Sequence, residues 1–191
     1  MKNDKDLEWT PVSVEHVIQD KWIDFRKVKY RFPDGSEFEP YYQYSRRSYV
    51  VIVAQDEEGN YLCVRQFRHG IGKVTVEFPA GGIESEGATD YSSEGAREDA
   101  QEAAKRELRE ETGYISDEWN HLITIPSNPT VADNYAFVFY AKNCKKASDL
   151  ELDDTEFLEL ELHTEEEIKQ LIDDGKFAQA IHVMAWLMTK N

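Results

Sequence analysis

The first half of the chain alternates short apolar runs with turn-forming residues. Residues 22–31, "WIDFRKVKYR", have the alternation of a strand, and Pro-Asp-Gly at 33–35 predicts a turn before extended structure resumes in "SEFEPYYQY". The run "SYVVIVAQ" is apolar on both faces, as in a buried strand, and "EEGN" turns the chain into "YLCVRQFR". The next strand, within "KVTVEFPAGG", is stopped by Pro79 and the glycine pair. This half is therefore predicted to be mostly strand.

The second half adds helical spacing. Residues 98–112 are predicted to be a helix that ends at Gly113, a residue suited to a left-handed C-cap. The segments "HLITIP", "YAFVFYAK" and "FLELEL" are further predicted strands. Thr164 is the expected N-cap of a helix that ends at Gly175. A last amphipathic helix is predicted in "FAQAIHVMAWLMTK", with Ala178, Ile181, Ala185 and Leu187 mostly on one side. The pattern favours a mixed α/β fold.

Composition excludes several other classes of protein. A chain of 191 residues with 40% hydrophobic and 12% aromatic residues is typical of a folded globular protein. The longest apolar run, "YVVIVA", is far shorter than the roughly 20 residues of a membrane helix. The N-terminus is polar, and two cysteines, Cys63 and Cys144, do not make a disulfide framework. We therefore expect a cytoplasmic protein.

The charge balance is strongly acidic. A net charge of −16, from 38 acidic and 22 basic residues, disfavours binding to nucleic acid or to an anionic membrane. If such a protein binds a phosphate-bearing substrate, charge must be cancelled at the site, and a divalent metal held by surplus carboxylates is the usual solution. The alternative is that the acidity only keeps the protein soluble.

Three carboxylates lie close together in "AAKRELREETGY", residues 103–114. At about 100° per residue, Glu107, Glu110 and Glu111 project from one face of the predicted helix. Ala100, Ala104 and Leu108 form an adjacent stripe that can pack on a sheet. Like charges at this spacing destabilise a bare helix, so the cluster needs a reason. From the charge pattern alone, a solvated face with outward ion pairs remains the alternative to a metal site.

The same stretch resembles the signature of the Nudix hydrolases, G-x5-E-x7-R-E-U-x-E-E-x-G-U, where U is a bulky apolar residue. Glu98, seven residues and then "RELREETGY" match it from Glu98 to Gly113, and Tyr114 stands at the last U. "VRQFR" followed by "EFPAGGIE", together with Pro129 about fifteen positions after the signature, is similar to the ADP-ribose pyrophosphatase-like subfamily. The resemblance covers roughly residues 40–190.

One departure concerns the spacing before Glu98. The family has five residues between the signature glycine and glutamate, whereas fifteen separate Gly82 from Glu98. We take Gly81-Gly82 as the anchor and "SEGATDYSSEGAR" as an insertion that forms a lengthened loop. It enters beside the expected active site, so covering the substrate, contacting a partner subunit and serving only as a surface loop are all open.

The resemblance assigns roles to particular residues. Glu107, Glu110 and Glu111 are expected to ligate Mg²⁺, or Mn²⁺ as the alternative, with the Ala80 carbonyl as a further ligand. Arg106 is expected to hold the glutamates in place. Glu98 would orient this network or reach a metal through water. The general base of related enzymes lies in a loop before a late strand, where Glu156 is the candidate and Asp154 the second choice.

The resemblance also implies substrate contacts. Arg68 corresponds to a residue that touches the pyrophosphate, with a solvent-facing arginine as the alternative. Tyr42, or else Tyr41 or Tyr30, is the candidate for stacking on adenine, and Arg47 or Arg46 for reaching the ribose or phosphates.

The fold implied is the Nudix α/β/α sandwich with a mixed sheet. Residues 1–45 would be N-terminal antiparallel strands that assist dimerisation and contact substrate, and residues 46–191 the Nudix hydrolase domain. The expected activity is Mg²⁺-dependent hydrolysis of ADP-ribose to AMP and ribose 5-phosphate by a homodimer that binds a small nucleoside diphosphate, and neither nucleic acid nor membrane. The alternatives are a nucleotide-sugar pyrophosphatase, for example for GDP-mannose, and a non-catalytic ADP-ribose sensor.

Overall fold

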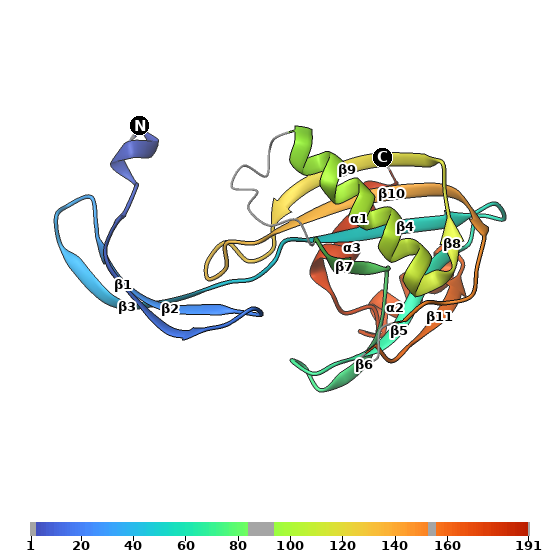
Figure 1. Ribbon diagram of the computed structural model, residues 1–191, viewed down its shortest axis with the longest axis horizontal. Helices are drawn as coiled ribbons and strands as arrows, with labels where there is room; N and C mark the ends of the chain where they lie inside the picture. Colours follow the sequence, from blue (N-terminus) through green and yellow to red (C-terminus); the bar gives the residue numbers. More distant parts are fainter. Residues whose placement is uncertain (1–2, 84–93, 153–155, 191) are drawn as a thin grey trace. The chain divides into compact units, whose positions relative to one another are not determined.

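The computed structural model describes residues 3–83, 94–152 and 156–190, and it divides into two compact units (Figure 1). Residues 1–47 together with 126–134 make the first unit, and residues 48–125 with 135–191 make the second. No helix in the described part of the chain is both long enough and apolar enough to span a membrane.

The first unit is an antiparallel sheet in the order β1-β2-β3. Its elements are the 3-10 helix η1 (Asp4–Asp6) and the strands β1 (Thr10–Gln19), β2 (Asp24–Arg31) and β3 (Glu37–Ser45). The predicted strand at 22–31 and the turn at Gly35, with a φ of 87°, are confirmed. Periodicity did not predict strand β1, although the resemblance implied antiparallel strands within residues 1–45, and all ten of its residues are exposed.

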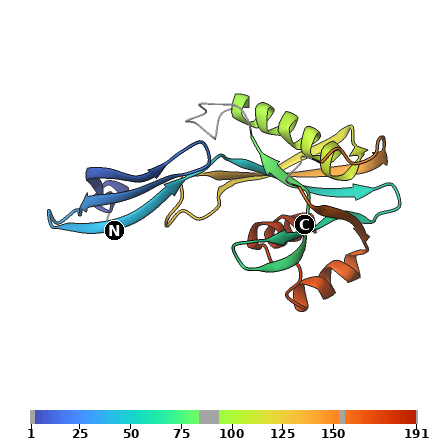
Figure 2. The same ribbon diagram turned by 60° about the horizontal axis from the view of Figure 1, so that its bottom comes forward.

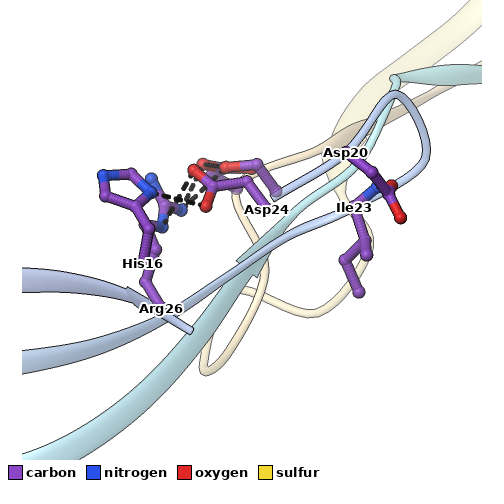
Figure 3. A network of polar contacts seen from close by, with 7 residues as sticks. His16, Asp20, Ile23, Asp24 and Arg26 are labelled. Atoms are coloured by element: carbon purple, nitrogen blue, oxygen red, sulfur yellow. Dashed lines mark hydrogen bonds and ion pairs between the residues drawn. The ribbon is translucent and has the colours of Figure 1, made fainter. Parts of the chain in front are cut away.

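Polar contacts tie this sheet together and attach residues 126–134 to it (Figure 3). Asp20 accepts hydrogen bonds from the amides of Trp22 and Ile23 and so closes the turn between β1 and β2. His16 Nδ1 lies 2.7 Å from Asp24 Oδ1. The next residue of β2 on the same face, Arg26, contacts Asp24 at 3.8 Å.

Arg26 is also the link to the connection between β9 and β10. Its Nη2 donates to Ser45 Oγ at 2.7 Å and to Asp133 Oδ2 at 2.9 Å. Tyr44 adds a backbone bond, because its N–H donates to the carbonyl of Val131 at 2.8 Å. The segment 126–134 is thereby held against β3.

The second unit is a mixed sheet in the order β11-β5-β4-β10-β8, with β6 paired to β5, β7 to β4 and β9 to β10. Strand β10 runs parallel to β4, and the other pairings whose direction is given are antiparallel. The strands are β4 (Tyr49–Asp56), β5 (Tyr61–Arg68), β6 (Lys73–Glu77), β7 (Ala80–Gly82), β8 (Tyr114–Ile115), β9 (Glu118–Pro126), β10 (Tyr135–Lys146) and β11 (Leu158–His163).

Helices cover both faces of this sheet (Figure 2). They are α1 (Glu94–Thr112), α2 (Glu165–Asp173) and α3 (Ala180–Met188). Alternate residues of β4 point to opposite faces. Val50 and Ile52 pack in the core on the α1 side, while Val51 and Val53 pack in the core that includes residues of α2 and α3. The unit is therefore an α/β/α sandwich with a mixed sheet, as expected.

The long helix α1 begins earlier than predicted. Ala100, Ala104 and Leu108 are fully buried, which confirms the predicted apolar stripe. The helix starts at Glu94 rather than at residue 98, so the end of the insertion is helical and not loop. Its Ser/Gly/Glu-rich composition hid this, because Ala96 packs into the core and extends the apolar stripe by one turn. Residues 85–93 of the insertion lie outside the described residues.

The last helix differs from the prediction in its start and in its buried face. It begins at Ala180, and Leu187 is exposed. The buried stripe is His182, Ala185 and Trp186, which has i, i+3, i+4 spacing. Of the predicted stripe, Ala185 is buried and Ile181 packs against the same core, whereas Leu187 is exposed and His182 was not predicted to be buried. Thr164 caps α2 as predicted, with a capping box to Glu167.

Candidate metal and active site

The last two turns of α1 place carboxylates against the sheet. Glu107 is only 7% exposed and Glu111 only 4%, whereas Glu110 keeps about a third of its side chain exposed. The helix ends at Gly113, whose φ of 72° is left-handed and whose N–H donates to the Arg109 carbonyl. Burying two acids four residues apart is costly unless their charge is compensated.

Arg106 supplies part of that compensation. Its Nη2 lies 2.7 Å from Glu107 Oε1 and its Nη1 lies 2.6 Å from Glu110 Oε2. Nη2 also approaches the Gly82 carbonyl at 3.3 Å. Burial raises the pKa of Glu107, and the positive charge of Arg106 opposes that rise. The guanidinium thus holds two of the three signature glutamates and ties them to the glycine turn.

The glycine pair leaves room for Glu107. A Cβ placed on Gly81 would lie 1.9 Å from Glu107 Cδ and 2.1 Å from its Oε1, so the carboxylate occupies the space that a side chain at 81 would need. At Gly82 a Cβ would meet nothing within 4 Å. The close approach of backbone and carboxylate is therefore specific to position 81.

Glu111 is the more deeply buried acid. Its Oε2 accepts a hydrogen bond of 3.0 Å from the Ala80 amide. The pKa of Glu111 is raised to about 8: burial is the main cause, the negative charges of Glu107 and Glu156 add to it, and the Ala80 amide and Arg68 act in the opposite direction. A carboxylate this strongly desolvated and surrounded by other acids is stabilised in its ionised form by an added cation.

The residues fit a divalent cation by their chemistry. Carboxylate and carbonyl oxygens are the donors that Mg²⁺ prefers, and the buried negative charge beside Gly81 needs a counter-charge. Among the described residues, no group of three His, Cys, Asp or Glu side chains is gathered into a metal-binding geometry. Glu107 and Glu110 instead form ion pairs with Arg106. Ala80 is a predicted metal ligand through its carbonyl. In the structure, its amide donates a hydrogen bond to Glu111.

The two other predicted acids are placed differently. Glu156 is half-buried just before β11, and its charge raises the pKa of both Glu107 and Glu111, so the structure brings it towards the pair. Asp154 lies outside the described residues. Glu98 is exposed on α1, nine residues before Glu107, which corresponds to about 13 Å of helix rise. The structure does not bring Glu98 to the cluster, and its predicted role stays a prediction.

Arg68 is anchored rather than solvent-facing. Its Nε donates to both oxygens of Glu77, at 2.9 and 3.0 Å, and its Nη2 contacts the same carboxylate. Glu77 is fully buried and also accepts hydrogen bonds from Thr75 and from Gln179, the latter at 2.8 Å. Burial alone raises the pKa of Glu77, but the hydrogen bonds from Arg68 and Thr75 outweigh burial and lower it. The pair is therefore ionised, and about a third of Arg68 remains exposed.

Sequence reasoning missed Glu77 and His182. His182 is 1% exposed, and its Nδ1 accepts a hydrogen bond of 3.1 Å from the Phe78 amide. Burial lowers the pKa of His182 to about 4, so the ring is neutral near pH 7. Each residue had a signal in the sequence: a lone acid inside the apolar strand "VTVEFP" and a lone histidine inside "AIHVMAWLM". In both cases burial of a polar group indicates a specific partner.

The predicted base- and ribose-binding residues belong to the first unit. Tyr42 is exposed and stacks on Phe25, with ring centroids 5.6 Å apart and an interplanar angle of 7°. Arg47 is exposed, and its carbonyl accepts from the Asn134 side chain. Arg46 is exposed as well. The alternatives Tyr30 and Tyr41 pack in an aromatic cluster around Trp9, and their predicted role stays a prediction.

Comparison with known proteins places this geometry in context. The family model of the NUDIX domain matches residues 45–187. An ADP-ribose pyrophosphatase of Bacillus subtilis (strain 168) is 28% identical over 94% of this chain and 94% of its own length. A methanol dehydrogenase activator of Bacillus methanolicus is 32% identical over 71% of this chain and 68% of its own.

A solved structure gives the same fold. The crystal structure of an ADP compounds hydrolase superposes with a TM-score of 0.79 over 96% of this chain and 92% of its own, at 22% identity. At that identity the likeness establishes the fold of the chain and not its substrate.

Proposed function

We propose, from the premise that this chain belongs to the Nudix hydrolase family, that it cleaves the pyrophosphate bond of ADP-ribose to AMP and ribose 5-phosphate with Mg²⁺. Nudix hydrolases generally use divalent metal ions, and the observation that carries the proposal is the buried pair Glu107 and Glu111 beside the Gly81 backbone. Similarity over 94% of the chain to a relative named ADP-ribose pyrophosphatase supports this substrate.

The cation would be held by Glu107, Glu110 and Glu111, with the Ala80 carbonyl as a further donor. When bound, a divalent cation cancels charge on phosphoryl oxygens and lowers the pKa of a coordinated water. Arg106 holds Glu107 and Glu110 in position before binding, since it contacts both. Its release from one of them would accompany loading of the site.

Two further residues would act on the reacting groups. Glu156, half-buried and near the acidic pair, would take the proton of the attacking water as general base. Arg68 would bind the pyrophosphate: Glu77 engages its Nε and Nη2, and we assign the two N–H donors of Nη1 to phosphate oxygens. The rigid pairing with Glu77 would fix the direction in which those donors point. Positioning and electrostatic stabilisation would together supply the rate enhancement.

The first unit supports a homodimer that forms through residues 1–45. Every residue of β1 is exposed, including the apolar Val12, Val14, Val17 and Ile18. Apolar strands of this length are normally covered, and a second copy of the chain would cover them. We also propose a cytoplasmic location, in keeping with two buried free thiols, Cys63 and Cys144. Light scattering of the full chain tests the dimer, and a monomer would refute it.

The test of the activity is an initial-rate panel with purified protein. The substrates are ADP-ribose, GDP-mannose, ADP-glucose, UDP-glucose, NADH and diadenosine polyphosphates, each with Mg²⁺, with Mn²⁺ and with excess chelator. We expect metal-dependent cleavage with ADP-ribose preferred. A preference for GDP-mannose would keep the chemistry and overturn the substrate. Tight ADP-ribose binding in calorimetry without turnover of any compound would identify a sensor and overturn the enzyme.

A further inference from the structure

The strand segment that borders the candidate metal site changes its pairing partner within a few residues. Residues of β6 up to Glu77 pair with β5, whereas β7 from Ala80 onward pairs with β4. Pro79 lies between them and has no N–H, although its carbonyl accepts from the Ile52 amide at 2.9 Å. At this crossing the ordinary ladder does not satisfy the Phe78 amide, which is buried and needs an acceptor from elsewhere.

The C-terminal part of the chain supplies contacts to three consecutive residues of this segment. The Val76 amide donates to the Lys176 carbonyl at 3.0 Å. The Glu77 carboxylate accepts from Gln179 Nε2 at 2.8 Å. The Phe78 amide donates to Nδ1 of His182 at 3.1 Å.

The side chains of Gln179 and His182 contact the segment 76–78 instead of stabilising helix α3. Gln179 is the N-cap residue of α3, yet its side chain makes no capping hydrogen bond. His182 places a polar ring at one of the three buried positions of α3. Such a ring is costly in a core unless it makes a specific hydrogen bond.

Two residues beyond Phe78 the segment meets the acids. The Ala80 amide donates to Glu111 Oε2 at 3.0 Å, and the next residue, Gly81, is in close contact with Glu107. Glu77 meanwhile fixes Arg68. The position of this one segment therefore sets the surroundings of both buried carboxylates and of the arginine.

We infer that His182 and Gln179 are positioning residues of the active site, which hold the segment Val76–Ala80 in register so that Glu111 and Arg68 are correctly placed for the cation and the pyrophosphate. The inference rests on the proposed function for the identity of the substrate, whereas its test by Mn²⁺ binding does not depend on that substrate. Groups behind metal ligands typically change metal affinity or activity by roughly 10–100-fold when removed.

The experiment measures binding of Mn²⁺ to metal-free protein, by the electron paramagnetic resonance signal of the free ion, together with kcat and KM for ADP-ribose. His182→Leu removes the acceptor for the Phe78 amide, and we expect Mn²⁺ binding to weaken by about tenfold or more, with a matching fall in kcat. His182→Asn restores a hydrogen-bond acceptor near the position of Nδ1. The Mn²⁺ affinity of this variant should return to within about threefold of the wild-type affinity, a smaller change than the loss of one typical hydrogen bond would cause.

Trp186→Leu is the matched control. Trp186 is buried one turn later on the same helix and does not contact the segment through a hydrogen bond in the described structure. We expect it to lower the thermal unfolding temperature while leaving Mn²⁺ affinity within about threefold, below the 10–100-fold range of positioning groups. If His182→Leu and Trp186→Leu weaken Mn²⁺ binding equally, or if His182→Leu leaves it unchanged, the inference is wrong.

Gln179→Ala keeps the test decisive if His182→Leu does not fold. Gln179 is only half-buried, and its loss removes a single donor to Glu77. We expect a several-fold fall in kcat, and unchanged kinetics would overturn the role of this residue. If the wild-type protein binds Mn²⁺ but does not cleave ADP-ribose, the proposed substrate is wrong. The comparison of Mn²⁺ affinity between the variants and the wild type still decides the inference. Wild-type protein that binds no Mn²⁺ would overturn both.

Discussion

Gly81→Ala tests whether the position of Glu107 matters for catalysis. The φ of Gly81 is not left-handed, so alanine is tolerated by the backbone, and the perturbation is one of space alone. The added Cβ would lie 1.9 Å from Glu107 Cδ. To reach the 3.0 Å below which real Cβ contacts essentially never fall, the carboxylate must move by 3.0 − 1.9 = 1.1 Å or more.

The displacement should cost little stability and much activity. The group that must move is the end of a flexible side chain, and a shift of about 1 Å strains its ion pair with Arg106 without removing either charge, so the cost should stay well below the roughly 3–5 kcal/mol of a broken buried pair. A catalytic group misplaced by about 1 Å, by contrast, costs on the order of 100-fold in rate. We therefore expect kcat/KM for ADP-ribose to fall about 100-fold with a nearly unchanged unfolding midpoint.

Gly82→Ala is the matched control, because its Cβ would meet nothing within 4 Å. The assay is release of phosphate from the products by a coupled phosphatase, with urea unfolding of each variant measured in parallel. Full activity of Gly81→Ala, or an equal loss in Gly82→Ala, would refute the claim that the glycine makes room for a catalytic carboxylate.

Three further predictions concern the surrounding networks. Arg68→Ala should destabilise the fold by about 2–3 kcal/mol, somewhat less than the loss of a fully buried pair, because the buried Glu77 loses its partner. Adding Glu77→Gln should restore the free energy of unfolding in urea but not the hydrolytic activity. If activity also recovered, Arg68 would not belong to the substrate site. His182 has a pKa of about 4 in the folded protein against an ordinary 6.5, so its contribution to stability is complete above pH 6.5 and is lost as the pH falls towards 4. His182→Asn should therefore lose less stability than the wild type over that range, and parallel curves from thermal unfolding at several pH values would contradict the assignment. Asp133→Ala should cost about 1 kcal/mol or less at low salt and still less at high salt, because the pair with Arg26 is partly exposed; a larger, salt-independent loss in urea unfolding would contradict a simple ion pair.

Periodicity predicted most of the second unit, because its elements carry their own signals. The continuous apolar run of β4 reports burial on both faces of the sheet, and the i, i+4 stripe of α1 reports burial against one of those faces. Strand β1 was invisible because all its residues are exposed, so no buried face imposes an alternation on it. The start of α1 was misplaced because helical structure at Ala96 comes from packing and not from local composition.

Only the part of the candidate site that lies on one helix could be predicted from the sequence. The spacing of Glu107, Glu110 and Glu111 fixes their common face, whichever fold surrounds them. The partners of Glu111 and Arg68 come from residues 31 positions earlier and nine positions later in the chain, respectively. The link from Phe78 to His182 spans 104 residues. Contacts of this kind depend on how the sheet is assembled, and no local pattern in the sequence encodes them.

The most direct test of the account is a comparison of wild-type protein with Glu111→Gln in the hydrolysis of ADP-ribose. Products would be separated by ion-exchange chromatography after incubation with Mg²⁺ and, in parallel, with excess chelator. We expect AMP and ribose 5-phosphate in equal amounts from the wild type with Mg²⁺ only, and neither product from a Glu111→Gln variant that remains folded. Equal turnover by the variant, or product formation that persists in chelator, would contradict the central claim that the buried glutamates hold a catalytic cation.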